Sequence, residues 1–470
     1  MTDEDRSPED DFQDLLRQLF GAGGQIDPEQ IHKLTGMNID PAMLAGLMQQ
    51  MQGAFAGADG GIPWDSARTA ALHIANQDGL SVTSGQRTDL DQAFALADLW
   101  LSAVTSISAL AQPARSLTRG DWVEQTMPVW QEAAEPVATS ITDALLDALG
   151  QQAPEEMRGV VEGAGRIMRS VGGSLFAAQL GQVIGRLSKE VVSGGDVGIP
   201  LLPVGEAAIL PQNFADFGQG LEIPEDQLAL YLATRELAHA RLFRHAKWLH
   251  LHVLSQLTDY ARGLEVDTSA LESMADRFDP ENPEELRAAL ESGALMPPRS
   301  EAQQAALTRL ENVLAVIEGW VEVVTEEATQ RLPDASRIAE AVRRRRAVGG
   351  PAERALGALV GLELRPRRLR EAGTMWRAIT EAVGAEARDG LWAYPDLLPT
   401  PEDIDDPAAI IGRLQAAARG EAAPRDEMDD ALERLLSGED FGDPEAADDS
   451  GGTTDDSGGT TEGPEGPRPV

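Results

Sequence analysis

The sequence contains no cysteine and almost no lysine. Without thiols, disulfide bonds and thiolate zinc sites are both excluded. Lysine occurs only at Lys33, Lys189 and Lys247, whereas arginine, alanine and glycine are abundant. This bias is typical of a GC-rich bacterial genome, and it carries no information about function.

The chain also lacks long apolar runs and a basic surface. No stretch approaches the roughly 18 uncharged apolar residues that a membrane-spanning helix needs. The first residues, Met1 to Arg6, are acidic and precede no apolar core, so we expect no signal peptide and a cytoplasmic location. The net charge of −39 argues against nucleic-acid binding and favours solubility.

What the sequence does contain is helical periodicity, which predicts a mainly α fold with few short strands. We expect an N-terminal helical segment over residues 1–60, a helical domain over 61–420 and a disordered acidic tail over 437–470. The tail repeats seven residues, Asp448–Thr454 and then Asp455–Thr461, and it has too few apolar groups to offset the entropy cost of ordering.

Within the helical domain, four early helices are expected, near residues 64–77, 88–110, 119–149 and 154–192. Gly181 and Gly185 allow close helix packing there, and Gln179, Gln182 and Arg186 argue against a membrane dimer. From Gly194 to about Pro224 we expect a loop-rich region with short strands at Leu201–Val204 and Ala208–Leu210.

The most informative segment is Arg235-Glu-Leu-Ala-His239. It matches the metallopeptidase motif H-E-x-x-H with the first histidine replaced by arginine. In that motif two histidines at i and i+4 hold one zinc ion, and the glutamate activates the metal-bound water. The segment lies in a helical region from Glu225 to Arg262 that we expect to break near Lys247.

His245 is a candidate third ligand, because longer peptidase motifs place a histidine six residues after the second one. Those motifs bend the chain at a glycine, whereas this sequence has Leu242 there. A separation of six residues is about 600° of helical rotation, which places His245 opposite His239 on a straight helix. It can reach a shared metal only if the helix ends or bends after Leu242.

A second carboxylate, Glu318, lies on a later amphipathic helix. Its apolar stripe includes Leu314, Ile317 and Val321, and Glu318 borders or enters that stripe. A carboxylate in such a position needs a cation or several hydrogen-bond donors. Glu-x-x-His on one helix with a glutamate from a later helix is the ligand pattern of many zinc peptidases.

With these motifs the chain resembles the zincin-like metallopeptidase family common in actinobacteria. The resemblance covers most of residues 10–415. It implies a mostly helical fold and peptide hydrolysis at zinc, with a peptide or protein as the substrate or partner. Its further marks are Trp64–Arg68, Asp98–Leu101, Gly120–Glu124, Arg235–Phe243, Ile317–Gly319, Gly361–Arg368 and Pro395–Pro399.

Two functions remain open at this point. In the first, the chain is a zinc-dependent peptidase with Glu236 as general base, His239 and Glu318 as metal ligands, and His245 or water completing the shell. In the second, the chain is a catalytically inactive relative in which Arg235 replaces a zinc ligand and pairs with Glu318. Arginine is permanently charged, cannot bind a metal, and suits a carboxylate through its fork geometry. On that hypothesis, removing Arg235 costs roughly 3–5 kcal/mol.

Two arginine-rich runs, Arg343–Arg346 and Arg365–Arg370, stand out in so acidic a chain. They can bind a phosphate or a substrate carboxylate. Internal ion pairing with the many acids is the favoured interpretation.

Overall fold

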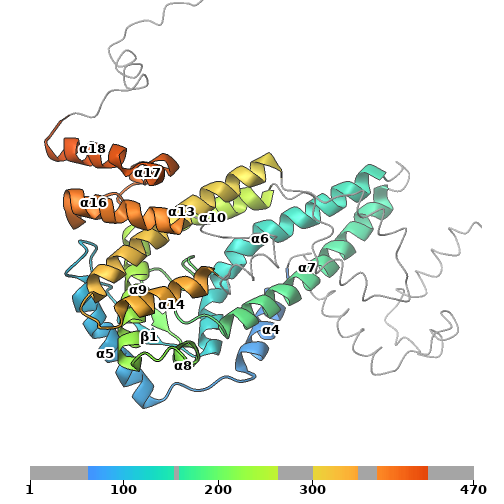
Figure 1. The fold of residues 1–470 in the computed structure, drawn as a ribbon. Coiled ribbons are helices and arrows are strands. Elements are labelled where there is room, and N and C mark those ends of the chain that lie inside the picture. Colours follow the sequence, from blue (N-terminus) through green and yellow to red (C-terminus); the bar gives the residue numbers. More distant parts are fainter. Residues whose placement is uncertain (1–61, 153–157, 263–299, 348–367, 422–470) are drawn as a thin grey trace, which may run out of the picture. The chain divides into compact units, whose positions relative to one another are not determined.

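The computed structural model describes residues 62–152, 158–262, 300–347 and 368–421, and these are mainly helical, as the sequence predicted (Figure 1). Two strands of two residues each accompany the helices. The helices are α4 (Trp64–Asn76), α5 (Ser84–Leu101), α6 (Arg119–Gln152), α7 (Arg158–Ser188), α8 (Pro211–Gly218), α9 (Glu225–His245), α10 (Lys247–Arg262), α13 (Glu301–Thr329), α14 (Ala335–Ala347), α16 (Leu369–Gly390), α17 (Pro401–Asp405) and α18 (Pro407–Ala418), with a 3-10 turn at Pro395–Leu397.

Residues up to Leu414 belong to one compact unit, and the chain from Gln415 onward belongs to a second. Only residues 415–421 of the second unit are described. The helical segment expected over 1–60 and the acidic tail expected over 437–470 both lie outside the described residues. The predicted division into three regions therefore remains a prediction.

Capping residues explain why one helix differs from its predicted range. The second early helix was expected over 88–110, but α5 begins at Ser84 and ends at Leu101. Thr83 accepts a hydrogen bond from the Gln86 amide through its hydroxyl, and the Gln86 side-chain oxygen in turn accepts one from the Thr83 amide. This capping box fixes the N-terminus of the helix a turn earlier than apolar periodicity alone indicates.

The helices pack against each other at small residues. α4 lies along α7, where an added Cβ at Gly181 would sit only 2.4 Å from the Ala67 carbonyl oxygen. A Cβ at Gly185 would lie 2.8 Å from the Ile74 Cβ. These two glycines let the helix backbones approach closely, which confirms the predicted role of the Gly181–Gly185 segment.

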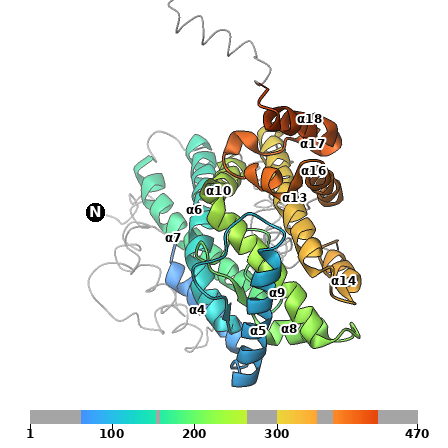
Figure 2. The ribbon, with the colours of Figure 1, turned by 90° about the vertical axis from the view of Figure 1, so that its left-hand side faces the viewer.

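Around the interior helix α9, α5 packs on one side and α13 on another, and α13 in turn contacts α10 and α16 (Figures 1 and 2). The chain breaks between α9 and α10 at Ala246, close to the expected position at Lys247. The helix of Glu236, α9, packs beside the helix of Glu318, α13, as a site shared by these two residues requires. The core includes four fully buried tryptophans, namely Trp122, Trp320, Trp376 and Trp392.

A buried carboxylate, Asp389 at the end of α16, ties this core together. Its Oδ2 accepts hydrogen bonds from the Thr105 hydroxyl at 2.6 Å and from the Ser106 amide at 2.8 Å. Its Oδ1 accepts from the Trp320 indole at 3.0 Å and from Arg388 Nε at 2.8 Å. Asp389 thus anchors the loop after α5 to α13 and α16.

The two strands differ from the sequence prediction. β2 (Ala208–Ile209) lies within the expected strand, but it pairs in parallel with β1 (Arg115–Ser116), which was not predicted. The expected strand at Leu201–Val204 is wrong, and α8 forms inside a region expected to be loop. Two-residue strands are too short to show period-two alternation, and they form because β1 and β2 meet in the tertiary fold. Among the described helices, none is long and apolar enough to cross a membrane.

Candidate functional site

The candidate site is built on α9, a helix buried over most of its length. Arg235 and His239 lie one turn apart on the same face, and Glu236 lies about 100° away from Arg235. The side chains of Glu236 and His239 are 2% and 5% exposed. An interior helix has neighbours on every side, so its polar side chains must each find a partner within the protein.

Arg235 and Arg346 both bind the carboxylate of Glu318 on α13. Arg235 Nη2 forms an ion pair with Oε2 of Glu318. Arg346, near the end of α14, donates from Nη2 to Oε1 at 3.0 Å and also pairs with Oε2. The predicted Arg235–Glu318 ion pair is therefore present, and a second guanidinium that was not predicted joins it.

These two cations explain how Glu318 stays charged although it is only 2% exposed. Burial alone would raise the pKa of this carboxyl group, because it disfavours the charged form. The guanidiniums of Arg346 and Arg235 outweigh burial and hold the pKa of Glu318 well below its usual range. The cluster of Glu318, Arg235 and Arg346, called the Glu318 cluster below, carries one negative and two positive charges.

Glu236 makes a different set of contacts. Its Oε2 accepts a hydrogen bond from the Gly195 amide at 2.7 Å, and its Oε1 accepts one from the Ala208 amide at 2.9 Å. Burial raises the pKa of Glu236 to about 7, although these two backbone hydrogen bonds and a third from the Ser193 side chain oppose the increase. The Glu236 carboxylate therefore links β2, through Ala208, to the preceding loop, through Gly195.

That loop, residues Gly194–Pro200, covers the site closely. A Cβ at Gly195 would lie 2.7 Å from both Cγ and Nδ1 of His239. Gly198 has φ of +79°, a conformation that favours glycine, and its Cβ would lie 3.1 Å from Oε1 of Glu318. The loop backbone thus approaches His239 and Glu318 at distances that only glycine permits.

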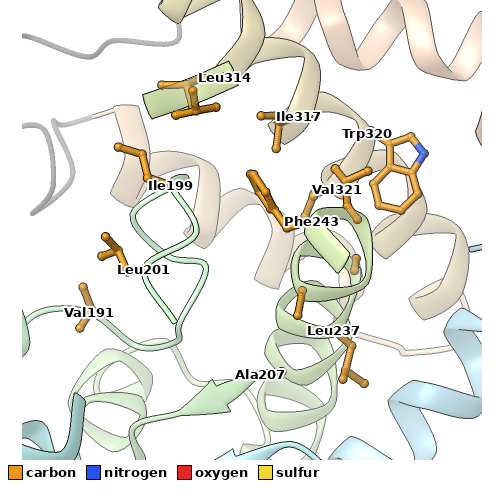
Figure 3. Close-up of a cluster of buried hydrophobic side chains, with 14 of the residues drawn as sticks. Val191, Ile199, Leu201, Ala207, Leu237, Phe243, Leu314, Ile317, Trp320 and Val321 are labelled. Carbon is orange, nitrogen blue, oxygen red and sulfur yellow. The ribbon is translucent and has the colours of Figure 1, made fainter. Parts of the chain in front are cut away.

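Apolar packing keeps the loop in place. Ile199 and Leu201 on the loop side, Phe243 on α9 and Leu314 and Ile317 on α13 belong to one buried cluster (Figure 3). Each is at most 5% exposed. Burying such side chains stabilises the fold by roughly 1.5–3 kcal/mol each, so displacing the loop is costly.

Asp196 adds a polar attachment between this loop and α14. Its carboxylate accepts a hydrogen bond from the Val192 amide at 2.9 Å and pairs with Arg345 Nη1 at 2.7 Å. Its backbone carbonyl accepts a hydrogen bond from Arg346 at 3.3 Å. Arg346 therefore contacts both the loop and Glu318.

His239 contributes an unpaired nitrogen. Its Nε2 is buried and has no hydrogen-bond partner among the described residues. Burial lowers the pKa of His239 to about 4, and the Glu318 charge only partly opposes this decrease. The imidazole is consequently neutral at pH 7.

His245 does not join this group. It is exposed at the last residue of α9, and the helix continues regularly through Leu242 without the bend that a shared metal would require. Among the described side chains, no three histidines or carboxylates are grouped so that they could hold a metal ion.

The donor atoms present do not fit zinc. Both oxygens of Glu318 are bound by guanidiniums, and both oxygens of Glu236 are bound by backbone amides. His239 Nε2 is the remaining donor in this group, whereas zinc sites need three or four protein ligands. A dication placed here would also face two arginines.

Sequence reasoning missed Arg346 as a site residue. In the run Arg343–Arg346 each arginine forms ion pairs with acids of the same chain, which confirms the favoured interpretation for this run. The sequence did contain a signal for this pairing. Arg343 and Arg346 share one face of their helix, and Glu318 and Glu322, four residues apart, share one face of a different helix. In the second run, Arg368 pairs with Asp405.

Comparison with known proteins agrees with this architecture. A family model described as zincin-like metallopeptidase matches residues 62–411, so the chain belongs to the zincin-like metallopeptidase family. A solved structure from Chloroflexus aurantiacus, titled a "putative hydrolase with a novel fold", is similar with a TM-score of 0.52 and 19% identity. The match covers 75% of this chain and 99% of that one, and at this identity it supports the fold alone. No curated protein matches the chain.

Proposed function

We propose that this chain is a non-catalytic member of its family, in which two arginines have replaced the metal, and that it acts by binding a peptide or protein. The observation that carries the proposal is the Glu318 carboxylate, held by Arg235 and Arg346. Arg235 stands where the motif has its first ligand. Two permanent cations supply the positive charge that a buried carboxylate requires, but neither can activate water.

The contacts of Glu236 support the same proposal. A general base must reach the proton that it removes. Both Glu236 oxygens instead accept backbone hydrogen bonds, and the loop of Gly194–Pro200 covers the neighbouring imidazole. A substrate would have to displace that loop before it could reach Glu236.

Zinc-dependent peptide hydrolysis is the second candidate, and two observations favour it. His239 keeps a buried, unpartnered Nε2, and the pKa of Glu236 is raised to about 7, which suits a general base. In this alternative His239 and Glu318 bind zinc after both arginines have moved away.

Metal analysis separates the two candidates. We expect protein purified without added metal to contain far less than one equivalent of zinc, and to cleave no peptide in a chelator-sensitive manner. One tightly held zinc together with chelator-sensitive cleavage would overturn the proposal.

A gain-of-metal variant tests the role of the arginines directly. In Arg235→His/Arg346→Ala the first-ligand position regains an imidazole and Glu318 loses both guanidiniums. We expect this variant to bind zinc stoichiometrically by equilibrium dialysis. Arg235→His/Arg343→Ala is the matched control, because Arg343 lies on the same helix but pairs with Glu322 and Glu326. Equal zinc binding by both variants would contradict the assignment of Arg346 to the site.

A further inference from the structure

A cavity of about 470 Å³ opens beside α5 and the start of α9, and it is lined by none of the residues of the Glu318 cluster. α8 and the turn after α13 complete its wall. Its size falls in the range of roughly 300–1,000 Å³ that is usual for ligand pockets. We call it the α5–α9 pocket.

The floor of the α5–α9 pocket is apolar. It is formed by Leu90, Ala93, Leu96, Phe214, Leu230 and Leu332. Most of these side chains also pack into the core, but Leu96 is 40% exposed. A leucine so exposed above an apolar hollow gains from being covered by another apolar group.

The rim of the pocket is acidic. Asp89, Glu225 and Asp226 are exposed there, and none of the described residues lining the pocket is lysine or arginine. None of these three carboxylates forms an ion pair with a described residue, in contrast to Glu318, Glu322 and Glu326. Glu225 and Asp226 stabilise the N-terminus of α9. Asp89 lies beyond the first turn of α5, so its negative charge does not stabilise the N-terminus of that helix.

We propose that the α5–α9 pocket binds a peptide segment that presents an apolar side chain flanked by lysine or arginine. The apolar side chain enters the hollow beside Leu96, and the flanking cations meet Asp89, Glu225 and Asp226. Charge complementarity of this kind fixes orientation and speeds association, and the net charge of −39 attracts a cationic partner from a distance. The segment belongs to another protein, which gives the proposed non-catalytic function its partner chemistry.

This proposal rests on the proposed function in one respect, namely that the bound peptide is a partner and is not cleaved. The probe is a short fluorescein-labelled peptide of alternating leucine and lysine, measured by fluorescence anisotropy with the full-length protein. We expect saturable binding that weakens at least about tenfold, or 1.4 kcal/mol, when its leucines become serine or its lysines become glutamate. If the peptide with serine in place of leucine bound as tightly as the original peptide, net charge alone would explain the binding, and the proposal would be overturned.

Paired variants on one helix locate the binding. Leu96→Asp places a charge in the pocket, whereas Leu99→Asp places the same charge on the same helix at a residue that is 67% exposed and does not line the pocket. We expect only Leu96→Asp to weaken binding, by about tenfold. Ala93→Trp, which fills the hollow, should act like Leu96→Asp, and circular dichroism verifies that each variant folds.

Other occupants give different outcomes. If a second copy of the chain fills the pocket, the protein sediments as a dimer and Leu96→Asp makes it monomeric, which overturns the proposal. If Leu96→Asp and Leu99→Asp bind the peptide equally well, the site lies elsewhere. Zinc content and peptide cleavage play no part in these readouts, so failure here is distinguishable from failure of the proposed function.

Discussion

Two of the buried carboxylates among the described residues, Asp389 on α16 and Glu318 on α13, lie on neighbouring helices and have different partners. Asp389 is surrounded by neutral donors from a hydroxyl, a backbone amide and an indole, with Arg388 as one cation beside it. Glu318 is bound by the guanidiniums of Arg235 and Arg346. Both carboxylates are at most 2% exposed.

The difference lies in the groups that bind each carboxylate. Neutral donors placed around Asp389 are typical of a structural carboxylate that holds elements together. Around Glu318 the donors are two charged guanidiniums, and a histidine with an unpartnered Nε2 lies beside them. Under the proposed function, this arrangement is what remains when a metal-binding pattern keeps its acid and one imidazole and replaces its dication by arginines.

Removing Asp389 should have the largest effect. Asp389→Ala leaves several buried donors without an acceptor, and we expect it to lower the free energy of unfolding by about 5 kcal/mol. Replacing the whole Glu318 cluster by methionine, in Arg235→Met/Glu318→Met/Arg346→Met, should change it by less than about 2 kcal/mol, because no charge is left unpaired. Urea denaturation measures both. If the triple variant proves as unstable as Asp389→Ala, the two carboxylates do not differ in the way described.

Breaking the Glu318 cluster unevenly should have the next largest effect. Arg235→Met leaves Glu318 with Arg346, so we expect a loss of only about 1–2 kcal/mol, less than the sequence alone predicted. Arg235→Met/Arg346→Met leaves the buried carboxylate without a cation and should cost about 4 kcal/mol, more than the sum of the single variants. Additive effects in this cycle would show that the two arginines do not share one partner.

The pH dependence of stability should separate His239 from Glu236. The pKa of His239 is lowered from 6.5 to about 4 on folding, so its contribution is complete above pH 6.5 and is lost as the pH falls toward 4. The pKa of Glu236 is raised from 4.5 to about 7, so stability is gained as the pH falls from 7 to 4.5. Each shift corresponds to roughly 3 kcal/mol, and in the wild type the two largely cancel.

Single variants should expose each contribution. Glu236→Gln should lose about 3 kcal/mol of stability between pH 6.5 and 4, whereas His239→Gln should become more stable by a similar amount between pH 7 and 4.5. Denaturant titrations at several pH values measure both, and His73→Gln, at an exposed histidine of α4, is the control. Parallel pH profiles for all three variants would exclude these buried groups as the cause.

The smallest expected effect concerns the loop above His239. Gly195→Ala should cost about 1–2 kcal/mol, because its Cβ would meet the imidazole at 2.7 Å. Gly390→Ala, beside Asp389, meets no atom within 4 Å and should change stability by less than about 0.5 kcal/mol. Thermal unfolding compares them. A tolerated Gly195→Ala would mean that the loop moves away from the site readily.

The helices of the site were predictable because apolar periodicity locates them without tertiary information. Glu318 was predicted to border or enter an apolar stripe, and a carboxylate there needed a cation or several hydrogen-bond donors. Its second partner, Arg346, was not predicted. The helix face that Arg343 and Arg346 share narrows four consecutive arginines to two, and only the packing of α14 against α13 selects between those two. The end of α5 at Leu101 was also missed, since the following loop is held by Asp389, which lies far away in the sequence.

The two arginines on Glu318 also differ in how far they lie along the chain, by 28 residues for Arg346 and 83 for Arg235. Closing the shorter segment costs about 1 kcal/mol less chain entropy. During folding, we therefore expect α13 and α14 to bring Arg346 to Glu318 before α9 docks. The Glu318 carboxylate is then already paired with Arg346 when it becomes buried. Arg235 joins the pair last, and its ion pair with Glu318 must break before α9 can separate from α13, which slows unfolding.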